Sequence, residues 1–520
     1  MTSRPAGSLA GAAAGLAGVG AFLGVAELAA AVTGPGSAPA VAIGQAAIAR
    51  TPEWLKQFAI AHFGENDKTV LKITVYVALA LAAAAVGALG VRTRRWVALA
   101  ATGVLAGVSS LSATTRPDAS LAAAFPSLLG AVAAAGGFVL LTRPRQLNEP
   151  AGAEFPGLPA APDRPPLSRR QLLVGAGSLA AFAAATYALG RETLRRTYNA
   201  VSSRAAVRLP RPTSRTPDVP GTGFDVPGLA PYVTPNSEFY RVDTALVVPQ
   251  VSTETYRLKI HGMVERPRTF SFQELLDMPL IERPITMICV SNPVGGPYIG
   301  NARWLGVPLA HVLDLVGVRS AAEQIFMTSS DGMTIGADLQ SATDGRPAML
   351  AVGMNGEPLP FEHGFPVRAV IPGVYGYASA CKWLVDIELT TYAARRAYWV
   401  QRGYAPKAPI KLESRIDTPV PFAQLRRGPV TVAGSAWHPT VGIASVEVRV
   451  DGGSWRKAAL AEVESADTWR LWRWQWHALP GTHTLEVRAI DRDGHIQSAI
   501  EKPVFPNGAS GRDSVVVTVS

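Results

Sequence analysis

The stretch from Ile285 to Pro308 carries the residues best suited to chemistry. Its sequence is ITMICVSNPVGGPYIGNARWLGVP, and it holds Cys289, one of two cysteines in the chain. A predicted strand that ends in a thiol and opens into a glycine-rich loop suits close backbone approach to a bulky ligand. A thiolate is also a ligand for soft or high-valent metals. The alternative is that Cys289 is a small buried hydrophobic residue, which is the commoner fate of a lone cysteine.

Segments on both sides of Cys289 resemble the molybdenum-cofactor domain of the sulfite oxidase family. They are, in order, TPN followed by Phe239-Tyr240, then TYRLKIHG, ARW, MNGEPLPFEHGFPVRAVIPGVYG, CKWL and YWVQRGY. The run HGFPVR with a KW pair downstream is the most specific part. The resemblance covers residues 226–520 and implies that Cys289 binds the molybdenum of a molybdopterin cofactor through sulfur.

The same resemblance implies which other residues hold the cofactor. His363, Arg368 and Lys382 match family positions that do so, and an arginine fork suits a buried phosphate. The other residues assigned to the cofactor are Phe239, Tyr240, Asn292 and Arg303. Outside this context, a histidine such as His363 is more often structural. Cys381 lies in a matched segment but is interpreted as structural.

An oxyanion substrate needs a positive pocket, and the family uses arginines for it. The candidates here are Arg241, Arg402 and Arg470, with Arg303 also considered; each could equally form a surface ion pair. The chain also departs from animal and plant sulfite oxidases. Their Asn-Arg-Arg run after the cysteine is Asn-Pro-Val here, and their active-site tyrosine falls in Met-Thr-Ile at 333–335. These departures affect sulfite specificity more than cofactor binding.

Composition indicates a membrane protein. The chain has 520 residues, 48% of them hydrophobic, and a net charge of +10. Its basic residues lie beside apolar runs, so topology explains them better than nucleic acid does. Apolar runs of about 20 residues, long enough to cross a bilayer, are Ala10–Val32, Leu71–Val91, Trp96–Ala113, Leu121–Leu141 and Gln171–Leu189. Glu27, near the end of the first, is predicted to face a partner helix or the interface.

Arginine placement predicts the orientation. The groups at Arg4, at residues 92–95 and at residues 143–170 fall on one side if the N-terminus is cytoplasmic. The loop at 34–68 and everything after 190 then lie outside the cytoplasm. Ser168 to Leu173, SRRQLL, resembles a twin-arginine export signal, although two topology-setting arginines would read the same. Such export suits a protein that acquires its cofactor before it crosses the membrane.

The predicted organisation follows from these segments. It comprises four transmembrane helices (1–143), a cytoplasmic proline-rich linker (144–170), a fifth transmembrane helix (171–190), a tether (191–225), an α+β molybdopterin domain (226–409) and an immunoglobulin-like β-sandwich (410–520). Within the α+β domain, Tyr256–Ile260 and Pro366–Ile371 read as strands, and Phe272–Leu275 and Leu309–Leu315 as helices. After about Thr418, period-two alternation and glycine-rich turns predict the sandwich. Its tryptophans at 469, 472, 474 and 476 are interpreted as core and interface.

Together these features predict a membrane-anchored, extracytoplasmic molybdopterin oxidoreductase. It would transfer an oxygen atom to or from a small sulfur-containing or oxyanion substrate and pass electrons to a separate carrier. The sandwich, which resembles the family's dimerisation domain, predicts a homodimer. No haem is expected, because His62 is the membrane half's one histidine. The alternatives are a reductase of sulfoxides or related oxides and a non-catalytic membrane-tethered binding protein.

Overall fold

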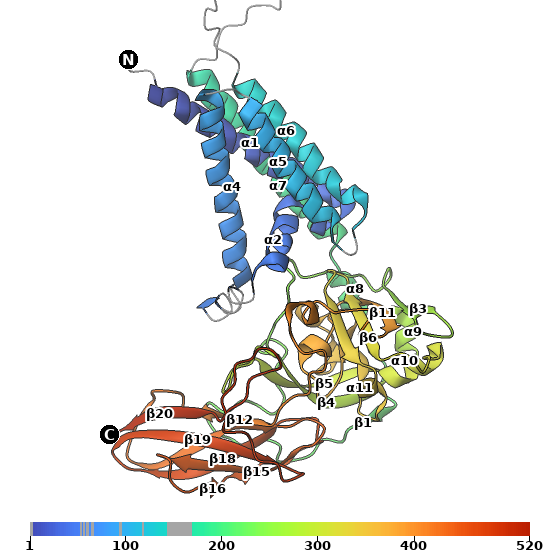
Figure 1. Cartoon of the computed structure of the whole chain (residues 1–520), viewed down its shortest axis with the longest axis vertical. Coiled ribbons are helices and arrows are strands. Elements are labelled where there is room, and N and C mark those ends of the chain that lie inside the picture. Colours follow the sequence, from blue (N-terminus) through green and yellow to red (C-terminus); the bar gives the residue numbers. More distant parts are fainter. Residues whose placement is uncertain are drawn as a thin grey trace, which may run out of the picture. The chain divides into compact units, whose positions relative to one another are not determined.

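The computed structural model describes residues 4–52, 67–92, 96–116, 119–142 and 169–520, together with Leu55, Phe58, His62 and Phe63. The chain divides into two compact units. The first comprises Met1–Asn199 with Thr244–Val247, and the second comprises Ala200–Asp243 with Val248–Ser520. The first is helical and the second is rich in sheet (Figure 1). Every residue predicted to hold the cofactor or the substrate belongs to the second unit.

The first unit is a bundle of helices. They are α1 (Arg4–Thr33), α2 (Pro39–Arg50), α4 (Asp67–Arg92), α5 (Trp96–Thr114), α6 (Phe125–Leu141) and α7 (Arg169–Thr197), with the short 3-10 helices η1 (Pro35–Ser37) and η3 (Leu121–Ala124). α1 packs against α4, α6 and α7. The helices approach closely at small residues: a Cβ on Gly15 would lie 2.1 Å from the carbonyl oxygen of Ala83. Glycine and alanine at such contacts are typical of helices that pack within a membrane.

Four of the predicted spans coincide with helices long and apolar enough to cross a membrane. These are Gly11–Thr33, Lys68–Leu89, Trp96–Thr114 and Leu121–Leu141. The fifth predicted span lies in α7, a continuous helix that is not among the four found in the described part of the chain. The predicted loop at 34–68 contains a helix that the sequence analysis missed, α2, which begins at a proline. The predicted linker between Pro144 and Ser168 lies outside the described residues.

Glu27 is buried inside the bundle and faces a partner helix, which is one of its two predicted environments. Its residue is 5% exposed, and Nη1 of Arg191 in α7 lies 4.0 Å from Oε1 of the carboxylate. Close by, the hydroxyls of Tyr76 in α4 and Tyr187 in α7 are 3.2 Å apart. These polar contacts join α1, α4 and α7, which suits the need of a buried charge for a partner in an apolar bundle.

Two sheets form the part of the second unit that carries the candidate site. The first sheet has β1 (Ser214–Arg215), β4 (Ile281–Ile288), β5 (Ile299–Pro308), β8 (Met349–Met354) and β10 (Arg368–Val370) in that order, and β9 (Glu357–Pro358) pairs with β8. The second sheet has the order β3 (Arg268–Ser271), β2 (Arg257–Gly262), β11 (Leu384–Thr390), β6 (Gln324–Ser329) and β7 (Thr334–Asp338). β1 pairs in parallel with β4, and β2 with β11, while the other described ladders of these sheets are antiparallel. These mixed sheets, with the short helices that connect them, agree with the predicted α+β class.

Short helices connect these strands. They are α8 (Val201–Ala206), α9 (Phe272–Leu276), α10 (Leu309–Val316), α11 (Gln340–Thr343), η4 (Phe361–His363), η5 (Gly376–Ala378) and η6 (Val400–Arg402). The two predicted helices are present as α9 and α10. α9 begins at Ser271, whose side chain forms a capping box with Glu274. α10 ends at Gly317, which has a φ of 67° that glycine adopts without strain.

From Glu413 the chain forms two further sheets. One has the order β12 (Glu413–Thr418), β14 (Gly428–Trp437), β18 (Arg470–Ala478) and β17 (Ala459–Leu460). The other has β13 (Gln424–Leu425), β20 (Ser514–Val519), β19 (Gly481–Asp491), β15 (Ile443–Val450) and β16 (Arg456–Lys457). Trp472 and Trp476 of β18 are buried between them with Val446, Leu485 and Val517. Period-two alternation therefore identified this core correctly.

Candidate active site

Cys289 lies directly after β4, where the strand gives way to a turn. The residue is 8% exposed, and the Ser291 backbone N–H donates to its Sγ at 3.4 Å. The Cys289 carbonyl accepts from the Asn292 backbone N–H at 3.0 Å, which closes the turn. Burial raises the pKa of the Cys289 thiol, against opposing effects of the Ser291 amide and the Lys382 ammonium. The thiol is therefore fixed in position, and a bound cation would be needed to favour its thiolate. Cys289 and Cys381 are both free thiols.

Asn292 holds the glycine-rich loop after Cys289. Its Oδ1 accepts the Tyr298 backbone N–H at 2.8 Å, and the residue is 3% exposed. Its Nδ2 is buried without a hydrogen-bond partner among the described residues. A buried amide N–H₂ without a partner is costly. Asn292 therefore has a donor to offer to a polar ligand at the end of β4.

Aromatic rings form the wall beside this turn. Phe239 stacks on Tyr240 with ring centroids 5.2 Å apart and meets the edges of Trp304 at 5.8 Å and His363 at 5.5 Å. The close fit requires a glycine in β5, because a Cβ on Gly300 would lie 2.7 Å from the Phe239 ring. Phe239 and Trp304 are 5% and 0% exposed. The structure therefore places Phe239 and Tyr240, two predicted cofactor residues, in one aromatic cluster with His363.

His363 is a neutral imidazole in this cluster. Its Nε2 lies 3.1 Å from the Asn236 carbonyl oxygen, which can only accept, so Nε2 carries the hydrogen. Burial, followed by the positive charge of Arg368, lowers the pKa of His363 to about 4. Near neutral pH the ring therefore donates from Nε2 and has Nδ1 as an acceptor.

Arg368 is the most unusual charged residue of the site. It is 4% exposed, its Nη1 donates to the His363 carbonyl at 3.1 Å, and its guanidinium lies 5.0 Å from the Trp304 ring centroid. No carboxylate lies within ion-pair distance of it among the described residues. Burial lowers the pKa of Arg368 to about 10. A buried arginine remains charged, so this arrangement favours an anionic ligand.

Lys382 and Arg241 share one carboxylate that the sequence analysis missed. The Asp243 Oδ2 lies 2.7 Å from the Lys382 Nζ and 2.8 Å from the Arg241 Nε. Lys382 also donates to the Glu362 carbonyl at 3.0 Å and lies 4.6 Å from the Trp383 ring centroid. Asp243 follows Arg241 by two residues, which is a local signal that the pair would form. The acid offsets one of the two positive charges at this edge of the site.

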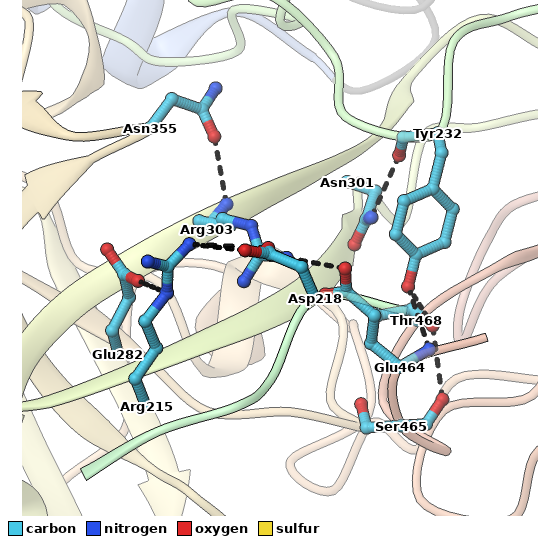
Figure 2. Close-up of polar contacts among 10 residues, drawn as sticks. All are labelled: Arg215, Asp218, Tyr232, Glu282, Asn301, Arg303, Asn355, Glu464, Ser465 and Thr468. Atoms are coloured by element: carbon cyan, nitrogen blue, oxygen red, sulfur yellow. Dashed lines mark hydrogen bonds and ion pairs between the residues drawn. The ribbon is translucent and has the colours of Figure 1, made fainter. Parts of the chain in front are cut away.

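Arg303, predicted to bind the cofactor, forms ion pairs at the joint with the sandwich. Its guanidinium pairs with Asp218 and with Glu464, which lie 85 and 161 residues away in sequence. Figure 2 shows these partners converging on it from the tether and from the sandwich, while Asp218 also pairs with Arg215. The Glu464 side chain is 4% exposed. These ion pairs join the tether and the sandwich to β5, while the Nη1 of Arg303 is buried without a hydrogen-bond partner among the described residues.

The remaining two predicted substrate arginines lie in different surroundings. Arg402, in η6, donates to the Tyr398 carbonyl at 2.9 Å, and its guanidinium lies 3.4 Å from the Tyr398 ring centroid. Arg470, in β18, donates to the carbonyls of Ala461 at 2.8 Å and Ile443 at 3.0 Å. Burial lowers the pKa of Arg470. Arg470 thus links the segment after β17 to β15, a strand of the other sheet of the sandwich.

The residues that do converge fit a bulky anionic cofactor carrying a metal. They offer one thiol, a buried arginine without a carboxylate, a neutral imidazole acceptor and an unpaired amide donor. Among the described residues, no group of three or more His, Cys, Asp or Glu is arranged to hold a metal ion. A metal at Cys289 would therefore take its other ligands from a cofactor.

Comparisons with known proteins agree with this donor set. Residues 245–399 match the family model described as the oxidoreductase molybdopterin binding domain, and residues 413–487 match the bacterial Ig domain. The mitochondrial sulfite oxidase of Mus musculus is 30% identical over 323 residues, which are 53% of this chain and 59% of that protein. The sulfite oxidase of Arabidopsis thaliana is 26% identical over 329 residues, 52% of this chain and 83% of that protein. The chain thus spans less than two thirds of the length of the mitochondrial relative.

A solved structure is also similar. The sulfane dehydrogenase SoxCD from Paracoccus pantotrophus has a TM-score of 0.49 and 24% sequence identity, over 56% of this chain and 84% of that chain.

Proposed function

Because the chain belongs to the sulfite oxidase family of molybdopterin-dependent oxidoreductases, we propose that it transfers an oxygen atom at a molybdenum centre held by Cys289. The substrate is a small sulfur-containing compound or oxyanion, and a separate carrier takes the electrons. The chain is anchored by its apolar helices, with the second unit outside the cytoplasm. Two copies pair through the sandwich.

The single observation that carries this proposal is the state of Arg368. Its guanidinium is buried beside His363 and Trp304 and has no carboxylate in ion-pair range among the described residues. An isolated buried charge is unfavourable unless a ligand compensates for it. The phosphate of a molybdopterin has the charge and the multiple acceptors that an arginine fork binds.

The other residues have roles that follow from their contacts. The Cys289 thiolate is the protein ligand of the metal, and the turn closed by Asn292 holds it in place. The His363 Nδ1 would be free to accept a hydrogen bond from the cofactor, because Nε2 is engaged with the Asn236 carbonyl. Phe239 and Trp304 are buried, and they would keep water from this side of a bound cofactor. When bound, the cofactor supplies a two-electron centre that exchanges an oxygen atom with the substrate.

The substrate is bound in this proposal by positive charge near the site. Arg241, Arg402 and Arg470 are the candidates, and each has a described partner that fixes its guanidinium. Of the three, Arg241 is linked to a predicted cofactor residue, because Arg241 and Lys382 both pair with Asp243. The shared acid makes this edge less positive than the family pattern predicts, which favours a substrate with a smaller negative charge.

Metal and pterin analysis of the full-length protein tests the function directly. We expect about one molybdenum and one pterin per chain. Turnover is then measured in both directions, as sulfite oxidation with ferricyanide and as sulfoxide reduction with a reduced viologen. Protein that contains neither metal nor pterin after expression with molybdate would contradict the proposal and favour a binding protein. Activity in the reductive direction alone would identify the reductase alternative.

Reporter fusions test the proposed topology. A fusion after Leu141 is expected to be cytoplasmic and a fusion after Pro220 extracytoplasmic, because the predicted arginine groups lie inside. Replacing Arg169 and Arg170 by lysine, which keeps the charge, should retain the second unit inside the cell if the pair is an export signal. A cytoplasmic reporter after Pro220 in the native sequence would rule out the five-span arrangement.

A further inference from the structure

A cavity lies at the edge of β4, where the tether and the sandwich both attach to this strand. Its volume is about 500 Å³, which is within the range of small-molecule sites. The Thr216 backbone N–H donates to the Glu282 carbonyl at 3.1 Å, and the Thr286 backbone N–H donates to the Asp467 carbonyl at 2.9 Å. Arg283 lies between these two attachments and lines the cavity. The cavity shares no lining residue with the candidate active site, so it is a separate place for a ligand.

Arg283 presents a positive charge to this cavity. Its Nη1 donates to the carbonyls of Ser214 and Glu282, both at 2.9 Å, and its Nη2 donates to the Ser214 hydroxyl at 2.8 Å. These three acceptors are neutral, because the Glu282 carboxylate pairs with Arg215 instead. No carboxylate lies within ion-pair distance of Arg283 among the described residues. The guanidinium is therefore held in position while its charge remains available to an anion.

Asp467 presents the opposite charge on the sandwich side. Its carboxylate accepts the Thr440 backbone N–H, and in the described part of the chain no lysine or arginine lies within ion-pair distance of it. Arg346, which also lines the cavity, is paired with Asp344 at 2.6 Å. Glu464 is a further lining acid, and its buried Oε2 has no hydrogen-bond partner among the described residues. The cavity therefore offers carboxylate oxygens to a cationic group.

Hydrogen bonds fix the sandwich wall of the cavity, and Figure 2 shows several of the residues that form them. The Ser465 hydroxyl accepts the Asp467 backbone N–H at 3.1 Å, and the Thr468 hydroxyl donates to the Ser465 carbonyl at 3.1 Å. The Tyr232 hydroxyl donates to the Thr468 hydroxyl at 3.1 Å and accepts the Glu464 backbone N–H at 3.3 Å. Because these contacts already order the loop, ligand binding has little further ordering cost there.

The two charged walls are separated by apolar side chains, which include Ile281 and Ala310. Asp467 is attached at Thr286, three residues along β4 from Arg283. A strand rises about 3.3 Å per residue, so the two backbone positions are about 10 Å apart. We propose that the cavity binds a small zwitterion, with its anionic group on Arg283, its ammonium group on Asp467 and a short aliphatic chain between them. This inference does not depend on the proposed function.

Calorimetric titration of the full-length protein in detergent, just above neutral pH, tests the site. Burial raises the pKa of Asp467 to about 6, so its carboxylate form predominates under this condition. γ-Aminobutyrate should bind at least about tenfold more tightly than butyrate or n-butylammonium, because each of these analogues lacks one charge-assisted contact. Equal affinity for the three compounds, or no measurable binding of γ-aminobutyrate, would overturn the proposal.

Two variants locate the ligand within the protein. Arg283→Gln should bind γ-aminobutyrate no more tightly than the wild type binds n-butylammonium, and Asp467→Asn no more tightly than the wild type binds butyrate. Arg283 is half-buried and has neutral partners, so its variant tests the site even if Asp467→Asn does not fold. Wild-type affinity for γ-aminobutyrate in Arg283→Gln would show that the compound binds elsewhere, and would overturn the assignment of this cavity.

Arg257→Gln is the matched control. Arg257 lies in β2 and is not part of the cavity lining. Like Arg283, it donates from Nη1 to two backbone carbonyls, those of Glu254 at 3.2 Å and Tyr256 at 2.7 Å. Its variant should keep the wild-type affinity for γ-aminobutyrate. A loss of binding as large as that in Arg283→Gln would attribute the effect to overall charge and would contradict a built site.

Discussion

Arg368 and Arg303 are two largely buried arginines of one domain, and they have opposite surroundings. Arg368 contacts backbone carbonyls and an aromatic ring and has no described carboxylate partner. Arg303 has two, Asp218 and Glu464, drawn from the tether and the sandwich. The difference teaches that a buried cation left without an acid marks a ligand site, whereas a compensated one serves the fold. Substitutions at the two positions should therefore affect different properties.

The largest stability effect is expected at the joint. Arg303→Met leaves the buried Glu464 carboxylate without its cation, which should lower the free energy of unfolding by about 3–5 kcal/mol. Urea unfolding of the detergent-solubilised chain, followed by tryptophan fluorescence, measures this. Glu464→Gln added to Arg303→Met should recover part of the loss. Equal stability of Arg303→Met and wild type, with cofactor lost, would place Arg303 at the ligand instead.

At Arg368 we expect the opposite result, in which stability is kept and cofactor is lost. Arg368→Met removes a buried charge that nothing compensates in the cofactor-free protein, so the stability of that form should stay the same or increase. Cofactor content, measured as pterin and molybdenum per chain, should fall at least about tenfold because the phosphate loses a charge-assisted partner. Full cofactor content in Arg368→Met would remove the distinction between the two arginines.

The pH dependence of stability sharpens the description of the joint. Burial raises the pKa of Asp467, three residues after Glu464, to about 6 from an ordinary 3.8. The folded state thus holds this proton more tightly than the unfolded state. The stabilisation of the folded state by this proton is therefore complete below about pH 4. It is lost as the pH rises through 6, and over this range the free energy of unfolding falls by up to about 1.4 kcal/mol per pH unit. Asp467→Asn should lack this decline, so an identical pH profile for variant and wild type would contradict the assignment.

The sequence predicted more of the pocket than of the joint, for a physical reason. His363 and Arg368 belong to one short run, HGFPVR, and Cys289 ends a strand whose pattern is local. The acids that engage Arg303 lie 85 and 161 residues away, so only the folded chain reveals them. Asp243 was missed although it follows Arg241 by two residues. Two opposite charges separated by one residue are a local signal, and that signal predicts this ion pair.

Helices and strands were likewise predicted where their sequence signal is local. The α9 capping box and the alternation of β18 are local patterns, and both elements were predicted. Helix α2 lies between two apolar spans, where the sequence predicts only a loop, because its short alanine-rich run has no distinct local signal.

The metal ligand itself is the central claim, and X-ray absorption at the molybdenum edge tests it most directly. The spectrum of Cys289→Ser should show one sulfur ligand fewer than the wild type, while turnover falls at least about a hundredfold. Cys381→Ser is the matched control: it removes the second buried thiol and should keep the wild-type sulfur count and activity. A wild-type number of sulfur ligands in Cys289→Ser would contradict the account.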